Sequence, residues 1–364
     1  MGRLTVQPKS ATIKTTPRDR LAIARLFWVR RPANSVTAVT FIGLSDKFFN
    51  SLQTAYPTSY MPHVLVRRLF SLAFLTVLVV ASAPAQVPSQ IHKSCSGGII
   101  LKVSAGVTTQ GSLLLTEVRS AKPLPPLSSE WDGHVNPLWS EDEKSATVHG
   151  LLGVDLEKKP GQYEWKVSWP GPDGKVLSCS VFVTVRTGKF PTERLTVEKQ
   201  FVQPDPEQQK RAEQDQKKMR AIYDTVTPRR LWDGKFLLPL KDATVGGNFG
   251  RRRILNGEAR SPHAGVDFPA LAGTPVFASQ SGKVVLAESL YYSGNTVVID
   301  HGFGIYTLYA HLSEIGVQSG DSVKAGAEIG KVGATGRVTG PHLHWGLTIQ
   351  HARVNGLGIA QRQP

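Results

Sequence analysis

The chain has 364 residues, 40% of them hydrophobic, and a formal net charge of +15 at pH 7. This length is sufficient for two folded domains, and the composition excludes a collagen-like or a wholly disordered protein. Nine basic and two acidic residues precede Tyr60, so much of the net charge lies in the first segment. Because a nucleic-acid interaction would rest largely on that segment, we predict no nucleic-acid partner.

The end of this first segment has the layout of a secretion signal. Arg67 and Arg68 precede an apolar run from Leu69 to Val80, and small residues follow as far as Ala85. A basic region, a short apolar region and an A-x-A-like site are typical of a secretory signal peptide. The apolar run is shorter than the about 20 residues that span a membrane.

From this layout we predict a signal peptide at residues 61–85, cleaved near Ala85. The residues before it, 1–60, are predicted to be an over-called, disordered extension, with Met61 rather than Met1 as the true start. The protein would then contact a membrane only transiently, through the signal segment, and would be periplasmic or extracellular. The alternative is that the apolar run remains as an uncleaved anchor.

Residues 86–190 contain short apolar or alternating runs that Gly, Pro and polar turns separate. Such runs predict β-strands, and we expect an immunoglobulin-like β-sandwich. The two cysteines of the chain, Cys95 and Cys179, bracket these runs, and an oxidising compartment favours their pairing. We therefore expect a disulfide; the alternative is two unpaired buried thiols. This region contains no recognisable catalytic constellation.

A linker at residues 191–235 follows. Asp205 with Pro206 is typical of a helix start, and basic residues gather toward the other end, as the helix dipole favours. We predict a helix at about 205–226, ended by Pro228, and assign it a spacer role between two β regions.

The C-terminal region, residues 236–356 with a tail at 357–364, contains the first candidate metal ligands. In SPHAGVDFPA, His263 and Asp267 are four positions apart. Pro and Gly within this stretch disfavour a helix. In an extended chain His263, Gly265 and Asp267 share one face, and the glycine leaves room there for an ion.

A second cluster lies in TGRVTGPHLHWGLTIQH, where His342 and His344 are one residue apart at the start of an expected strand. Alternate residues of a strand point to one face, so both imidazoles should project into the same space. Such a pair alone is as readily a hydrogen-bonded surface pair. Together with His263 and Asp267, however, one histidine of this pair completes the two nitrogens and one carboxylate that suit a zinc site with an open fourth position.

A further histidine, His311, ends an alternating run in YTLYAHLSEI, with Tyr309 on its face. Imidazole is suited to proton transfer near neutral pH, so His311 and the other histidine of the pair are candidates for activating water or stabilising an oxyanion. A buried Tyr/His strand end is the structural alternative. The stretch from Gly316 to Gly333, short strands with glycine turns, is similar to the barrel-like sandwich of biotinyl and lipoyl carrier domains, and we interpret it as fold.

The three motifs HAGVD, YAHL and GPHLH, in this order, resemble those of the lysostaphin-type (LytM-like) zinc metalloendopeptidases, which cut peptidoglycan peptides. NFGRRR and GNTVVIDHG also resemble the family, and the resemblance extends over about Leu238 to Asn355. It implies a C-terminal antiparallel β-sheet metallopeptidase domain of barrel-sandwich-like type. Together with the immunoglobulin-like sandwich and the linker helix expected before it, this predicts a mainly β chain.

The resemblance also implies roles for single residues. His263, Asp267 and His344 would bind one zinc ion per chain, and His311 and His342 would be catalytic. The expected partners are peptidoglycan peptides, in which a cross-link or a stem peptide would be cut. The alternative is a catalytically silent wall-binding protein or an activator of other wall hydrolases, for which this complete set of residues would be unnecessary.

Overall fold

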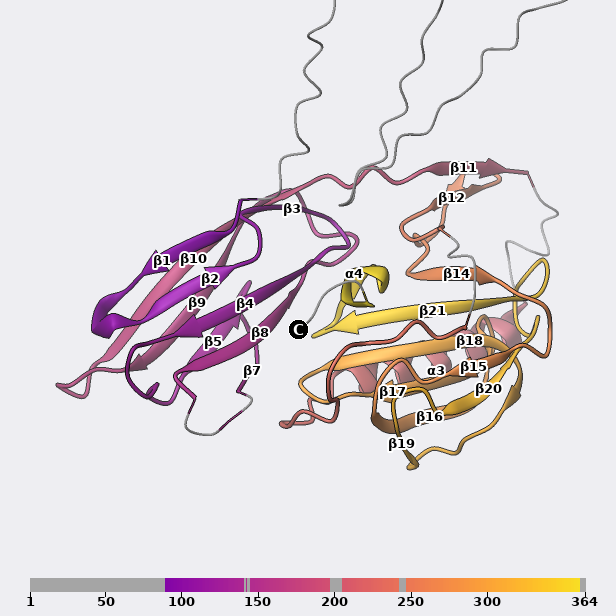
Figure 1. Cartoon of the computed structure of the whole chain (residues 1–364). Coiled ribbons are helices and arrows are strands. Elements are labelled where there is room, and N and C mark those ends of the chain that lie inside the picture. The colour runs from indigo at the N-terminus through magenta and orange to yellow at the C-terminus, as the bar shows by residue number, and fades with distance from the viewer. Residues whose placement is uncertain (1–88, 141, 143–144, 197–204, 242–246, 361–364) are drawn as a thin grey trace, which may run out of the picture. The chain divides into compact units, whose positions relative to one another are not determined.

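The computed structural model describes residues 89–140, 142, 145–196, 205–241 and 247–360 (Figure 1). The described residues all belong to one compact unit. The predicted extension and signal peptide lie outside the described residues. Within these ranges, no helix is long and apolar enough to cross a membrane.

The first β region is a sandwich of two five-stranded sheets, ordered β1-β2-β4-β8-β7 and β3-β10-β9-β5-β6. A short 3-10 helix, η1 (Ser96–Gly98), follows the first strand. The strands are β1 (Ile91–Ser94), β2 (Ile100–Val103), β3 (Val107–Thr109), β4 (Leu113–Arg119), β5 (Ser128–Trp131), β6 (His134–Val135), β7 (Leu138–Trp139), β8 (Thr147–Gly153), β9 (Gly161–Pro170) and β10 (Val176–Arg186).

Alternating burial explains this sandwich. On β9, Trp165, Val167 and Trp169 are buried, whereas the residues between them are partly exposed. Period-two burial is what a strand with one face on a core requires. The buried side chains of both sheets form one apolar cluster. The immunoglobulin-like sandwich predicted from the sequence is therefore confirmed as part of a mainly β fold.

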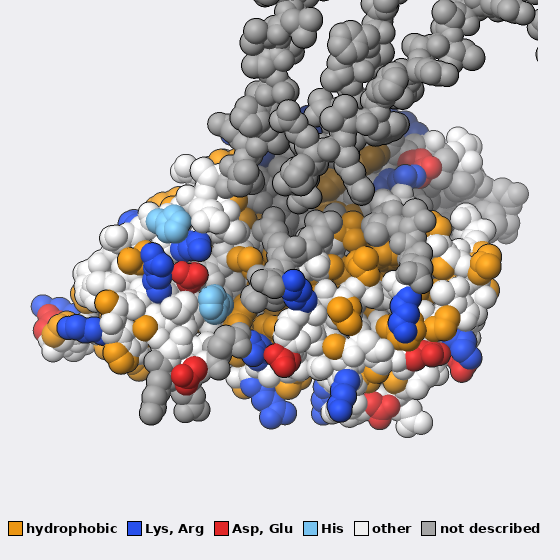
Figure 2. Space-filling view, viewed as in Figure 1, with side chains coloured by type: hydrophobic (Ala, Val, Ile, Leu, Met, Phe, Trp, Pro, Cys, Tyr) orange, Lys and Arg blue, Asp and Glu red, His pale blue; other side chains and the backbone are white. Residues whose placement is uncertain are grey.

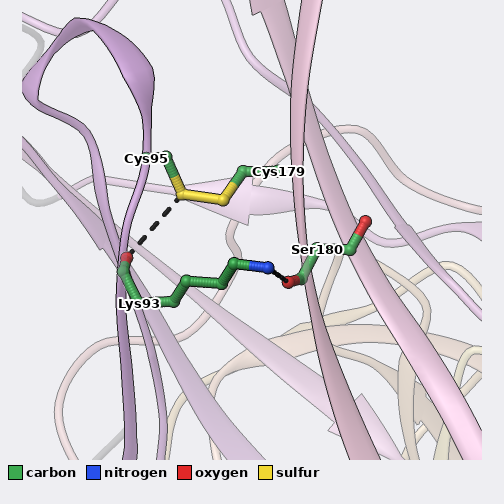
Figure 3. Close-up of a disulfide and its surroundings, with 4 residues drawn as sticks. All are labelled: Lys93, Cys95, Cys179 and Ser180. Atoms are coloured by element: carbon green, nitrogen blue, oxygen red, sulfur yellow. Dashed lines mark hydrogen bonds between the residues drawn. A yellow bond between two sulfur atoms is a disulfide. The ribbon is translucent and has the colours of Figure 1, made fainter.

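A disulfide joins the two sheets of the sandwich (Figure 3). Cys95 directly follows β1 in one sheet, and Cys179 lies in β10 of the other, with their Cα atoms 6.1 Å apart. Beside it, the Lys93 ammonium donates to the Ser180 carbonyl at 2.7 Å. The predicted pairing of the two cysteines is confirmed.

The linker contains a strand, β11 (Thr192–Leu195), and a helix, α3 (Pro206–Tyr223). The Asp205 side chain accepts from the Gln208 N–H at 2.8 Å, and the Gln208 side chain in turn accepts from the Asp205 N–H, so a capping box starts the helix. The helix lies inside the range expected from the sequence. The helix is more than a spacer, because its face with Met219 packs against the second β region, whereas most of its charged side chains are exposed as the sequence suggested.

The second β region is built on one nine-stranded, antiparallel sheet with the path β14-β21-β18-β17-β16-β19; β15 and β20 pair with each other, β20 also pairs with β18, and β22 pairs with β21. A small sheet β11-β12-β13 precedes it. The elements are β12 (Arg252–Leu255), β13 (Glu258–Ala259), β14 (Gly265–Pro269), β15 (Pro275–Phe277), β16 (Gly282–Leu290), β17 (Gly294–Asp300), β18 (Ile305–Ile315), β19 (Ser322–Val323), β20 (Glu328–Val332), β21 (His342–Ile349), β22 (Ala352–Val354) and a short helix α4 (Leu357–Ala360).

Strand β21 carries the second histidine cluster, and its burial follows the expected alternation at its start. Leu343 and Trp345 are fully buried in the core of this region, whereas His342 and His344 are only half-buried on the other face. The predicted antiparallel β architecture is confirmed.

On the face in Figure 2, Lys and Arg side chains of described residues are spread among Asp and Glu side chains.

Candidate metal centre

The pairing of β14 with β21 brings the two predicted ligand clusters together. In this antiparallel pair Asp267 lies directly opposite His344. The His263 Nε2 atom is 3.0 Å from Asp267 Oδ1, and the His344 Nδ1 atom is 3.2 Å from Asp267 Oδ1 and 2.9 Å from His263 Nε2. Two imidazole nitrogens and one carboxylate oxygen therefore converge within 4.8 Å of one another.

The surroundings of these three side chains fit a metal ion. A Cβ atom at Gly265 would lie 2.6 Å from His344 Nε2 and 2.7 Å from the Trp345 carbonyl oxygen, so only glycine leaves the His344 ring its place. The sequence predicted that this glycine leaves room for an ion, whereas the space that it leaves is beside the His344 ring. The three side chains are 17%, 13% and 17% exposed, so the centre is partly open to solvent.

The protonation states of the cluster also suit a cation. Burial opposes ionisation of Asp267, but hydrogen bonds and charge interactions with His263 and His344 outweigh it, and the pKa of Asp267 lies well below its usual value. Burial lowers the pKa of His344, although its hydrogen bond to Asp267 partly opposes the shift. A carboxylate together with two imidazole nitrogens is a donor set that zinc takes in proteins.

Asn248 is a member of the centre that the sequence reasoning did not single out. Its amide Nδ2 donates to Asp267 Oδ2 at 3.0 Å, while the other carboxylate oxygen faces the histidines. Its backbone has a φ of 75°, a left-handed conformation that Asn tolerates better than most residues. The signal in the sequence was the Asn-Phe-Gly at the start of NFGRRR, an Asn next to a turn. Such hydrogen bonds to a ligand carboxylate orient it toward a metal.

His342 and His311 lie beside the three candidate ligands. The His311 and His342 ring centroids are 4.9 Å apart, and those of His311 and His344 are 5.9 Å apart. His342 Nε2 is 3.8 Å from Asp267 Oδ1. All five residues predicted from the sequence therefore meet at one place on the sheet.

Each of these two histidines has one ring nitrogen fixed by a backbone carbonyl. The Nδ1 of His311 is 2.9 Å from the Thr335 oxygen, and the Nδ1 of His342 is 2.9 Å from the Gly340 oxygen. Because a carbonyl only accepts, each Nδ1 carries the proton, and the Nε2 of a neutral ring keeps its lone pair. Burial is the main reason that the pKa of His311 falls to about 4, so this ring is neutral near pH 7.

The backbone of His311 departs from the regular strand end that the sequence suggested. His311 lies inside β18 with a φ of 63°, and the pairing of β18 with β20 is irregular just after it, between Leu312 and Glu314. Its N–H donates to the Ser293 carbonyl at 2.9 Å. A non-glycine residue in this conformation costs about 1 kcal/mol or more, and its neighbours must hold it there.

His301 lies apart from the centre. It is fully buried, with Nδ1 2.8 Å from the Ser281 oxygen and Nε2 2.7 Å from Thr307 Oγ1. Burial lowers its pKa to about 4. Its hydrogen-bond partners give it a structural role.

The similarity to known protein families includes the region that contains this centre. The model of Peptidase family M23 matches residues 261–356, which contain the five site residues predicted from the sequence but not Asn248. Peptidoglycan DD-endopeptidase ShyA of Vibrio cholerae is 46% identical over 114 residues, 31% of this chain and 26% of ShyA. DD-carboxypeptidase/endopeptidase Mpg of Neisseria meningitidis is 44% identical over 102 residues, 28% of this chain and 24% of Mpg.

The alignments thus span about a quarter of the length of these curated relatives. A solved structure of a putative peptidase M23 from Pseudomonas aeruginosa matches 69% of this chain and 94% of its own, with a TM-score of 0.52 and 28% identity. That similarity extends well beyond the residues matched by the family model.

Proposed function

We propose, on the premise that residues 261–356 are a peptidase family M23 domain, that this protein is a zinc metalloendopeptidase that hydrolyses peptide bonds in peptidoglycan. The observation that carries the proposal is the convergence of His263 Nε2, His344 Nδ1 and Asp267 Oδ1, with the rings of His311 and His342 beside them.

His263, Asp267 and His344 would hold one zinc ion per chain. Zinc supplies a Lewis acid that polarises a carbonyl and makes water a nucleophile near neutral pH. Asn248 holds the second oxygen of Asp267, so the carboxylate keeps its direction toward the histidines. The buried, ionised carboxylate offsets part of the positive charge of the bound ion.

His311 and His342 would perform the proton transfers. Because the Nδ1–H of each ring is bonded to a carbonyl, each Nε2 can accept a proton from the attacking water and return it to the leaving amine. In its protonated form the same Nε2–H can donate to the oxyanion of the tetrahedral intermediate. The low pKa of His311 keeps it in the accepting form before reaction.

The substrate class comes from the relatives, because ShyA and Mpg are named as a peptidoglycan DD-endopeptidase and a DD-carboxypeptidase/endopeptidase. A cross-link or a stem peptide is therefore the proposed target. Export is part of the proposal, to the periplasm or the cell exterior. The disulfide between Cys95 and Cys179 supports export, since such bonds persist in oxidising compartments.

The test is mass spectrometry of the products after incubating the zinc-loaded protein with defined cross-linked muropeptides. We expect two fragments whose masses identify the bond, and no product with His342→Ala. The matched control is His134→Ala, which removes an exposed histidine from β6 of the sandwich and should cleave as the wild type does.

Two results would contradict the proposal in different ways. Binding of peptidoglycan without any cleavage by the zinc-loaded wild type would favour the silent wall-binding or activator function. Equal cleavage by the wild type and by His342→Ala would instead remove His342 from the chemistry while leaving a peptidase.

A further inference from the structure

The turn between β16 and β17, which we call the β16–β17 turn (residues 290–294), holds the backbone of His311. The Ser293 carbonyl accepts from the His311 N–H at 2.9 Å. Gly294 packs directly against Thr335, whose carbonyl accepts from the His311 ring, and a Cβ at Gly294 would collide with the Thr335 backbone. The turn and the Thr335 segment therefore fix both the main chain and the ring of His311.

The helix α3 holds the other side of this turn. The Asp215 carboxylate accepts from the Tyr291 N–H at 2.7 Å, and the Tyr291 hydroxyl donates to the Gln208 side chain at 2.9 Å. The Arg211 guanidinium donates to the Ser289 carbonyl at 3.3 Å. Three side chains from the first ten residues of α3 thus bond to the end of β16 and to the turn. Those of Asp215 and Arg211 bond to backbone groups, and that of Gln208 bonds to a side chain.

Apolar packing of α3 occurs mainly further along the helix. Met219, Ile222 and Tyr223 pack with buried residues of β16, β17 and β18, and the Tyr223 and Tyr306 ring centroids are 5.4 Å apart. These contacts attach the helix to the sheet whether or not Asp215 reaches Tyr291. The hydrogen bond of Asp215 to the turn is therefore not needed to attach α3 to the sheet.

Apart from Leu290, which belongs to the apolar cluster that α3 packs against, close packing does not hold the turn against α3. A pocket of about 520 Å³ lies between them, lined in part by Asp215, Met219, Leu290, Tyr292 and Ser293. The hydrogen bond from Tyr291 to Asp215 restrains the main chain next to Ser293 from the side of α3, and the hydrogen bond from the Arg337 N–H to the Tyr292 carbonyl, at 2.9 Å, restrains it from another segment. A restraint of this kind is directional, unlike apolar contact.

We propose that α3 is a positioning element of the active site, in which Asp215 holds Tyr291 and through the β16–β17 turn sets the place of His311. The inference rests on the proposed function only in that His311 acts on the substrate. Asp215 is a positioning residue, since it touches neither the candidate metal ligands nor a reacting atom. The linker helix would then contribute to catalysis by holding His311 in position.

The first test compares three variants of the full chain in α3. Asp215→Ala removes the acceptor, and we expect kcat to fall about tenfold with KM, zinc content and the circular dichroism spectrum unchanged, because a small displacement of a catalytic group is costly. Asp215→Asn keeps an oxygen that accepts from Tyr291, and we expect it to restore kcat to within about twofold. The control Glu213→Ala removes an exposed carboxylate that accepts from Gln209 within α3, and it should leave kcat unchanged.

The second test measures amide hydrogen exchange, which needs no catalytic activity. In Asp215→Ala we expect faster exchange at the amides of Tyr291 and His311, with the amides of α3 and β21 as protected as in Glu213→Ala. Unchanged exchange at the His311 amide would overturn the proposal, as would a kcat for Asp215→Ala equal to that of Glu213→Ala. If the wild type cleaves no muropeptide, the proposed function fails, and the exchange result still decides whether Asp215 positions His311.

Discussion

Replacing Gly265 by alanine should impair metal binding without unfolding the protein. Gly265 has an ordinary strand conformation that alanine also adopts, but the new Cβ would lie 2.6 Å from His344 Nε2 and 2.7 Å from the Trp345 carbonyl oxygen. An ordinary carbon–nitrogen contact is about 3.5 Å, so the imidazole must move by about 0.9 Å. The ring cannot easily do so, because the flanking Leu343 and Trp345 are fully buried.

We expect the affinity for zinc to fall about 10- to 100-fold, comparable to the loss of a group that orients a metal ligand. The overpacking should also lower the free energy of unfolding by about 1–3 kcal/mol. Affinity would be measured by competition with a chromogenic chelator, and stability by urea unfolding of the metal-free protein.

The register of the sheet supplies a matched control. Gly346 lies directly opposite Gly265 in the β14–β21 pair, and a Cβ there would meet only the Leu308 side chain, at 3.4 Å. Gly346→Ala should therefore bind zinc as the wild type does. Equal zinc affinities for the two alanine variants would refute the argument that Gly265 makes room for His344.

Three further predictions concern other parts of the described structure. Asn248→Gly, which keeps the left-handed backbone but frees Asp267 Oδ2, should weaken zinc binding about tenfold in the same competition assay, and an unchanged affinity would contradict the orienting role. His301 has a pKa of about 4 when folded, below its usual 6.5, so the unfolded state binds the proton first; the free energy of unfolding should fall by about 3 kcal/mol between pH 7 and pH 4, and His301→Gln should flatten this dependence in urea titrations. The disulfide closes a separation of 84 residues, so replacing Cys95 and Cys179 together by serine should lower the free energy of unfolding by about 4 kcal/mol, seen as a lower midpoint of the sandwich transition; an unchanged midpoint would show that the cross-link does not stabilise the sandwich.

The local pattern of the sequence predicted much of the centre. The four-residue spacing of His263 and Asp267 and the alternate positions of His342 and His344 depend only on which side chains share a face of an extended chain. The glycine between His263 and Asp267 follows the same rule, and Gly265 does leave the room that His344 occupies. The β-sandwich and its disulfide also followed from short apolar runs and from two cysteines that bracket them.

Other features arise from contacts between segments distant in the chain. Asn248 is hydrogen-bonded to Asp267, and Asp267 contacts His344, which is 77 residues away in the chain. Both contacts depend on which strands pair and in which register. The left-handed backbone of His311 donates its N–H to Ser293, and its ring is bonded to the Thr335 carbonyl from a different loop, so no local periodicity contains these constraints.

The sequence by itself thus determined the strand-forming segments, the residues able to bind a metal and the choice of ligand types, because these depend on side-chain chemistry and on the two-residue period of a strand. Only the tertiary structure decided that the charge-rich linker helix packs against the sheet and that Asp215 reaches the turn beside His311. A solvated spacer and a packed helix can share one local sequence pattern, and the difference lies in which distant surface is available to bury its apolar face.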